Sequence, residues 1–166
     1  TLANGTLTFN PGETSKNINA VIVDDLLNEV SEDINVTLSA PVNAVLGATV
    51  LGTYTILDND PLPSVSFALA SSSGLESVSP ATMTVNLSAP SGKTVQVTYS
   101  VSGTATGGGV DYTLANGTLT FNPGVTSQTI SATIVNDLIT EADETIVVTL
   151  GVPTNALQGA ILAHTY

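Results

Sequence analysis

Two acidic segments of the chain carry the residues whose types and spacing suit chemistry. The first runs from Asp24 to Glu32 and the second from Asn136 to Glu144, and each follows an apolar, β-branched run. Carboxylates crowded this closely repel one another unless a positive charge lies among them. Hard cations such as Ca²⁺ bind several oxygen ligands at once, from carboxylates, backbone carbonyls and water. We therefore interpret both segments as cation-binding loops at the ends of β-sandwich domains, with Ca²⁺ as the expected ion.

The composition favours cations as partners and argues against nucleic acid. Asp and Glu number 14 against 2 Lys and Arg, so the net charge is -12 in 166 residues. Phosphate recognition needs clustered lysine and arginine, which this chain lacks. Membrane insertion is not expected either, because no apolar run approaches the roughly 18 residues of a span. Cysteine is absent, which excludes disulfides and thiolate metal sites.

The chain repeats itself. The segment from Thr1 to Gly12 recurs letter for letter from Thr113 to Gly124, 112 positions later, and the match continues without a gap to Tyr166. Roughly three in five of the aligned residues are identical, which marks a tandem repeat. We expect about one and a half repeats. Residues 1–60 are the C-terminal half of one repeat, 61–63 are a Pro-rich joint, and 64–166 are a nearly complete repeat without its final acidic segment.

Apolar residues that alternate with polar ones predict an all-β fold, an immunoglobulin-like antiparallel sandwich. The alternating runs are Met83–Leu87, Val95–Val101, Ile130–Ile134 and Ile146–Leu150 in the second copy, and Ile18–Ile22 and Ile34–Leu38 in the first. Turn residues such as Asn122-Pro123-Gly124 separate them. Half a sandwich would expose sheet edges and an apolar face. We therefore expect the missing strands to come from adjoining sequence or from neighbouring chains.

A set of short motifs follows in a fixed order along the chain. They are Val65-Ser66-Phe67, Gly74-Leu75-Glu76, Gly103-Thr104-Ala105, Val110-Asp111-Tyr112, Gly117–Phe121 with Pro123-Gly124, the acidic loop and Val148-Thr149-Leu150. The joint before them, which ends the first copy, reads Ile56-Leu57-Asp58-Asn59-Asp60. As a set they resemble the Calx-β domain, over essentially the whole chain. This family includes calcium-sensing domains of sodium/calcium exchangers and tandem repeats of large bacterial surface proteins. The resemblance implies a sandwich that binds Ca²⁺ at one end.

The resemblance also implies two sets of calcium ligands. In the second copy they are Glu76, Asp111, Asn136, Asp137, Glu141 and Glu144, with the carbonyl of Ile139 as a further candidate. In the first copy they are Asp24, Asp25, Glu29, Glu32, Asp58, Asn59 and Asp60. Asn136 stands where the first copy has Asp24, and Asn59 interrupts an acidic triplet. Fewer charges predict weaker binding, such as the Kd of about 10⁻⁴–10⁻³ M of extracellular modules.

Two functions fit these features, and no enzyme is expected. The first is a calcium-binding structural or adhesive module of an extracellular bacterial surface protein, in which Ca²⁺ stiffens the domain poles and joints. Its partners would be neighbouring repeats or copies of the same chain. The alternative is a subunit of an extracellular filament assembled by strand complementation between chains. Calcium sensing is disfavoured by the thin ligand set. The only histidine, His164, shows no catalytic partner in the sequence and is expected at the surface or at a sheet edge.

Overall fold

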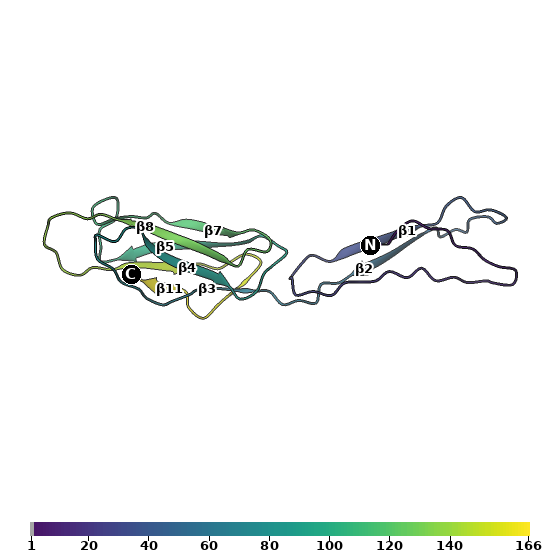
Figure 1. Cartoon of the computed structure of the whole chain (residues 1–166), viewed down its shortest axis with the longest axis horizontal. Helices are drawn as coiled ribbons and strands as arrows, with labels where there is room; N and C mark the ends of the chain where they lie inside the picture. The colour runs from purple at the N-terminus through teal and green to yellow at the C-terminus, as the bar shows by residue number, and fades with distance from the viewer. Residues whose placement is uncertain (1) are drawn as a thin grey trace. The chain divides into compact units, whose positions relative to one another are not determined.

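The computed structural model describes residues 2–166 and divides them into two compact units (Figure 1). The first unit comprises residues 2–25 and Asp33–Ile56, and the second comprises Leu26–Glu32 and Leu57–Tyr166. In the described chain, no helix has the length and apolar character that a membrane crossing requires. The regular elements are β1 (Glu32–Thr37), β2 (Leu51–Ile56), β3 (Ser64–Phe67), β4 (Ala81–Leu87), β5 (Val95–Gly103), β6 (Tyr112–Thr113), β7 (Gly117–Phe121), β8 (Ser127–Ile134), β9 (Ile146–Leu150), β10 (Leu157–Gln158) and β11 (Ala163–Thr165).

The second unit is a two-sheet sandwich, which confirms the predicted fold class. One sheet has the order β10-β3-β4-β8-β6 and the other β11-β9-β5-β7. All neighbouring strands are antiparallel except the short pair β10 and β3. Alternate side chains of β4 and β5 are buried, as the period of two predicts. The largest fully buried side chains are Phe67, Phe121 and Met83.

The antiparallel pairing of β4 with β8 shows which loops lie at each end, or pole, of this sandwich (Figure 1). Because the two strands are antiparallel, the end of β4 lies beside the start of β8, where the Leu87 amide donates to the Thr126 carbonyl at 2.9 Å. The Gly124 amide likewise donates to the Ser91 carbonyl at 2.9 Å. The turn 89–93 therefore lies at one pole, and the acidic loop that follows β8 begins at the other.

The first unit contains only one strand pair, β1 with β2. In the repeat, these strands correspond to β9 and β11 of the second copy. The predicted strand Ile18–Ile22 does not form, so this prediction is wrong. Its counterpart in the second copy, β8, is held by β4 and β6, whereas within residues 2–166 the segment 18–22 pairs with no strand. A strand needs such non-local partners to satisfy its backbone groups.

The apolar residues of the first unit consequently line an open groove instead of a core. Ile18 and Ile22 are 44% and 40% exposed, whereas their counterparts Ile130 and Ile134 are buried or half-buried. The groove has a volume of about 450 Å³. Its walls are Leu2, Ile18, Asn19, Ala20, Ile22, Ile34, Val36, Gly52, Thr53 and Tyr54.

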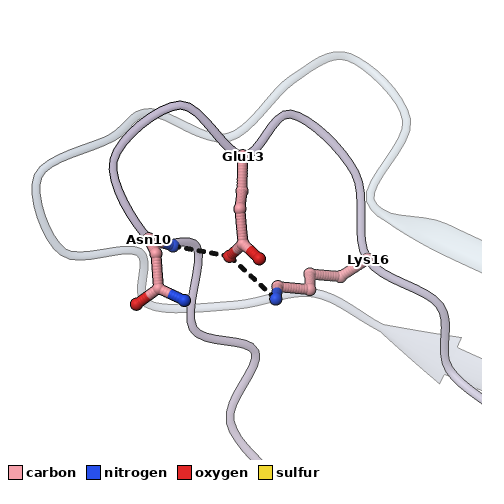
Figure 2. Close-up of polar contacts among 3 residues, drawn as sticks. All are labelled: Asn10, Glu13 and Lys16. Atoms are coloured by element: carbon pink, nitrogen blue, oxygen red, sulfur yellow. Dashed lines mark hydrogen bonds and ion pairs between the residues drawn. The ribbon is translucent and has the colours of Figure 1, made fainter.

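A locally encoded turn does form in both copies. The Glu13 amide donates to the Asn10 carbonyl at 2.9 Å, and Gly12 has a φ of 87°, as a Pro-Gly turn of this kind requires. Figure 2 shows the Glu13 carboxylate accepting from the Asn10 amide at 2.7 Å and from Lys16 Nζ at 2.8 Å. The Lys16 ammonium, with the Asn10 amide, lowers the pKa of Glu13. Because these contacts are short in sequence, the turn forms without the rest of a sandwich.

His164 lies on β11, an edge strand, but its side chain is only 3% exposed. Its Nδ1 is 2.8 Å from the Leu69 carbonyl, which accepts only, so the Nδ1 proton is donated there. In the neutral ring, Nε2 then accepts from the Ser72 hydroxyl at 2.7 Å. The expected position of His164 at a sheet edge is correct. Its side chain can be buried because Ser72 and Leu69 provide a hydrogen-bond partner for each ring nitrogen.

Candidate metal centre

The acidic side chains of three loops line one cavity of the second unit. Figure 1 shows the backbone of this unit, in which β8 leads into one of the three loops. Glu76 comes from the connection between β3 and β4, Asp111 directly precedes β6, and the segment 136–144 joins β8 to β9. Together they line an open cavity of about 800 Å³. The oxygen-bearing side chains of its wall include Glu76, Asp111, Asn136, Asp137, Glu141, Asp143 and Glu144.

Asp111 is positioned by the backbone on both sides. Tyr112 of β6 pairs with Ile134 of β8, and the Val135 amide donates to the Asp111 carbonyl at 2.8 Å. The Asp111 amide donates to the Thr106 carbonyl at 3.0 Å, while the Thr106 amide donates to the Asp111 carboxylate. A short strand pair therefore places Asp111 beside the start of the acidic loop, although Asp111 and Val135 are 24 positions apart in sequence.

The acidic loop itself is shaped by local contacts. The Ile139 amide donates to Asp137 Oδ1 at 2.7 Å, a side-chain turn typical of aspartate. Ile139 is exposed and is not among the residues that line the cavity. Its carbonyl, proposed as a ligand from the resemblance, thus stays a prediction, as do the ligand roles of the other residues.

Within residues 2–166, no lysine or arginine lies among the carboxylates that line the cavity. Reduced hydration raises the pKa of Glu141, and the charges of Asp111, Asp137 and Glu76 raise it further. For Glu144, a side-chain hydrogen bond with Asp111 raises the pKa most, followed by reduced hydration and by the charges of Asp111 and Glu141. Both glutamates are exposed, so screening by water keeps these shifts modest. The two lysines are engaged elsewhere, Lys16 with Glu13 and Lys93 with Asn28.

The donor set fits a hard divalent cation, but the loops stand open. Carboxylate and amide oxygens with no sulfur or imidazole suit Ca²⁺ and not Zn²⁺ or copper. The proximity of Asp111 raises the pKa of Glu144, and a cation between the two carboxyl groups would relieve their repulsion. Across residues 2–166, no three Asp, Glu or His side chains are arranged to hold one ion. Binding at this pole would therefore require the loop 136–144 to close on Asp111 and Glu76.

The residues proposed for the first copy are divided between the two units. Asp24 and Asp25 belong to the first unit, and Asn59 lies in the second. Glu29, Glu32, Asp58 and Asp60 also belong to the second unit. Asp58 Oδ2 and the Asp60 carbonyl both accept hydrogen bonds from the Asn28 side chain, at 2.7 and 2.8 Å. Their ligand roles stay predictions.

Sequence reasoning missed two groups of residues. Asp143 lines the cavity but was not proposed as a ligand, although its place between Ala142 and Glu144 in the acidic loop was a usable signal. Asn28 and Lys93 were also missed, because 65 positions separate them and nothing in the acidic segment Asp24–Glu32, which contains Asn28, points to Lys93.

We predict that, without calcium, the second repeat becomes more stable as the pH falls from neutral towards the carboxyl range. A carboxyl group with a raised folded-state pKa binds a proton more readily when folded, so its protonation favours folding and its ionisation at higher pH opposes it. The gain should develop as the pH falls through the raised pKa values of Glu141 and Glu144, which lie above their ordinary 4.5. Thermal melts at several pH values, followed by circular dichroism, measure it.

The double variant Glu141→Gln with Glu144→Gln should flatten this response. Glu13→Gln also removes a carboxylate, but one whose pKa is lowered by Lys16, and should leave the response of the second repeat in place. An unchanged pH response in the double variant would contradict the prediction.

Comparison with known proteins identifies relatives along the chain. A model of the Calx-beta domain matches residues 1–60 and 58–164. Sodium/calcium exchanger 2 of Mus musculus is 33% identical over 166 residues, covering 90% of this chain and 18% of the exchanger. Sodium/calcium exchanger 1 of Rattus norvegicus is 30% identical over 168 residues, covering 90% and 17%. The chain thus spans less than a fifth of the length of these curated relatives.

Solved structures share the fold. The crystal structure of CBD12 from CALX1.2 aligns with a TM-score of 0.56 at 23% identity, over 61% of this chain and 42% of that one. The apo-form Calx CBD1 domain aligns with a TM-score of 0.55 at 22% identity, over 63% of this chain and 96% of that one. With the family model matched over both copies of the repeat, the chain belongs to the Calx-beta domain family.

Proposed function

We propose that this chain is a calcium-binding structural repeat of an extracellular bacterial surface protein. Ca²⁺ binds at the pole formed by Glu76, Asp111 and the loop 136–144 and stiffens it. The ion neutralises the carboxylates and links three loops that come from separate parts of the chain. Neighbouring repeats or copies of the chain are the partners, and the role is mechanical or adhesive instead of catalytic.

One observation carries this proposal: acidic side chains from three separate loops line a single cavity without a basic residue among them. Such a cluster raises the pKa values of Glu141 and Glu144, which means that the folded protein carries repulsion at neutral pH. A divalent cation relieves that repulsion, and its binding free energy adds to the stability of the folded domain. The tandem repeat and the Pro61-Leu62-Pro63 segment favour a module of an array over an isolated sensor.

Titration of the chain with CaCl₂ by isothermal calorimetry is the direct test. We expect saturable binding with a Kd of about 10⁻⁴–10⁻³ M. The double variant Asp137→Ala with Glu141→Ala should abolish the binding assigned to the second repeat. Magnesium is the matched ion control, because it demands a tighter octahedral geometry and should bind more weakly to open loops. No heat of binding at millimolar Ca²⁺ would reject the proposal.

The first unit favours a second candidate function, a filament subunit completed by strand exchange. Its groove is lined by Ile18, Ile22, Ile34, Val36 and Tyr54. Their counterparts in the second unit lie in or against a core to which β3, β4 and β5 also contribute. Strands of that kind from another chain would bury the groove and supply the missing sheet partners. In that arrangement the first unit is stable only when assembled, so its stability depends on protein concentration.

A further inference from the structure

Asn28 is a buried polar side chain of the second unit that makes three hydrogen bonds outside the acidic cavity. Only 6% of it is exposed. Its Nδ2 donates to Asp58 Oδ2 at 2.7 Å and to the Asp60 carbonyl at 2.8 Å, and its Oδ1 accepts from Lys93 Nζ at 3.0 Å. The side-chain amide therefore uses both its donor hydrogens and its acceptor within the protein.

The partners of Asn28 determine how its amide is oriented. The Lys93 ammonium only donates and the ionised Asp58 carboxylate only accepts, so oxygen must face Lys93 and nitrogen must face Asp58. Both hydrogen bonds involve a charged partner and are stronger than neutral ones, because the amide dipole lies between a positive and a negative group. Lys93 thereby supplies the positive charge of this cluster from within the chain.

The backbone around Asn28 makes a second set of contacts. Its carbonyl accepts from the Gly92 amide at 3.1 Å and from the Ser91 hydroxyl at 3.3 Å, and Ser91 is only 2% exposed. The Glu29 side chain crosses Gly92 so closely that a Cβ there would come within 2.6 Å of Glu29 Cγ. The turn Ser91–Lys93 thus contacts the segment Leu26–Glu32 through side-chain hydrogen bonds, a backbone hydrogen bond and close packing of Glu29 on Gly92.

These contacts join parts of two repeats. By sequence, Leu26–Glu32 is the larger part of the acidic segment Asp24–Glu32 of the first repeat, yet structurally it belongs to the second unit, together with the turn Ser91–Lys93. That turn lies at the pole of the sandwich opposite its own acidic cavity. The loop of one repeat is therefore built into the far pole of the repeat that follows it.

We propose that Asn28 fastens the acidic loop of one repeat to the next repeat without a metal ion, with the turn Ser91–Lys93 as its docking surface. The segment Leu26–Glu32 then stays attached when calcium is removed, and any ion bound nearby adds to a junction that is already closed. This inference is independent of calcium binding at the pole of the second repeat. The counterpart of Asn28 in the second copy is Thr140, which cannot make the same three contacts.

Hydrogen–deuterium exchange of the whole chain, in excess chelator and in millimolar CaCl₂, tests the proposal. In the unmodified chain, the Gly92 amide and the segment 26–32 should be equally protected under both conditions. Asn28→Ala removes three hydrogen bonds and should speed exchange at these sites about tenfold or more. Loss of protection in the unmodified chain on chelation would overturn the proposal.

Asn28→Asp provides the sharpest variant. It replaces both donors by a carboxylate that faces Asp58, so exchange in the segment 26–32 should be fast in chelator and slow again in calcium. Thr140→Ala, at the equivalent position of the second copy, is the matched control and should leave these sites unchanged. Unaltered exchange in both Asn28 variants would overturn the proposal.

Amides of β4 and β8 report in the same experiment whether a variant still folds. If Asn28→Ala disturbs those strands, Lys93→Met replaces it, because it keeps most of the side-chain stem and loses only the ammonium. Faster exchange confined to Gly92 and the segment 26–32 supports the fastening role. Exchange at these sites that matches the unmodified chain refutes it.

Discussion

Phe121→Ala should lower the free energy of unfolding of the second repeat by about 3–5 kcal/mol. Phe121 is fully buried at the end of β7, where it pairs with Val95 of β5. Removing its ring leaves a cavity between the two sheets, which close packing fills only in part. Urea denaturation followed by circular dichroism measures the loss, which should also lower the melting temperature of this repeat markedly.

Phe9→Ala is the matched control, because Phe9 occupies the same place in a letter-for-letter copy of the segment Thr113–Gly124. Phe9 is 51% exposed, so its replacement should change stability by no more than about 0.5 kcal/mol. An equal and concentration-dependent cost at Phe9 would show instead that the first unit is completed by another chain. Size-exclusion chromatography of both variants at several concentrations separates these outcomes.

Asp111→Asn should abolish most of the stabilisation that calcium gives to the second repeat. Asp111 interacts with several parts of the cavity. Its charge helps to raise the pKa values of both Glu141 and Glu144, and its backbone carbonyl accepts a hydrogen bond from the Val135 amide. At a calcium concentration one hundred times the Kd, binding stabilises the fold by about 2.7 kcal/mol. For a domain of this size, that corresponds to a rise in melting temperature of roughly 10–20 °C.

Asparagine keeps an oxygen that accepts from the Thr106 amide, so the loop should keep its shape while the site loses one charge. The melting temperature in chelator should therefore stay the same or rise slightly, because one repelling charge is gone, and the rise caused by calcium should shrink. Asp33→Asn, which alters a strand-pair contact with Thr55 in the first unit, is the charge-matched control. A full calcium response in Asp111→Asn would remove this residue from the site.

The strands of the second unit were predictable because each carries its own alternating pattern. Met83, Val85 and Leu87 lie on one face of β4, because side chains of a strand alternate between its two faces. The sequence pattern alone therefore predicts that this face is buried. The same reasoning failed for Ile18–Ile22. Its pattern matches that of β8, yet a strand is completed by its neighbours, and the pattern carries no information on whether those neighbours are present.

The candidate metal centre divides in a similar way. Acidic residues concentrated in one loop indicated a cation site, and the resemblance to Calx-β domains added Glu76 and Asp111 from distant parts of the chain. Their convergence on one cavity depends on the pairing of β6 with β8, which brings Asp111 beside Val135. Local spacing cannot predict such a contact, because it is closed by the sheet and not by the residues in between.

The amino-acid sequence by itself determined the repeat, the all-β class, the Pro-Gly turns and the negative charge of the loops, since each of these depends on neighbouring residues. Only the tertiary structure decided that Asn28 lies between Asp58 and Lys93, and that His164 is buried against Ser72. A polar side chain can hold two segments together, or be buried with its hydrogen bonds satisfied, only when segments distant in sequence exclude water around it. Packing, and not residue type, brings those segments together.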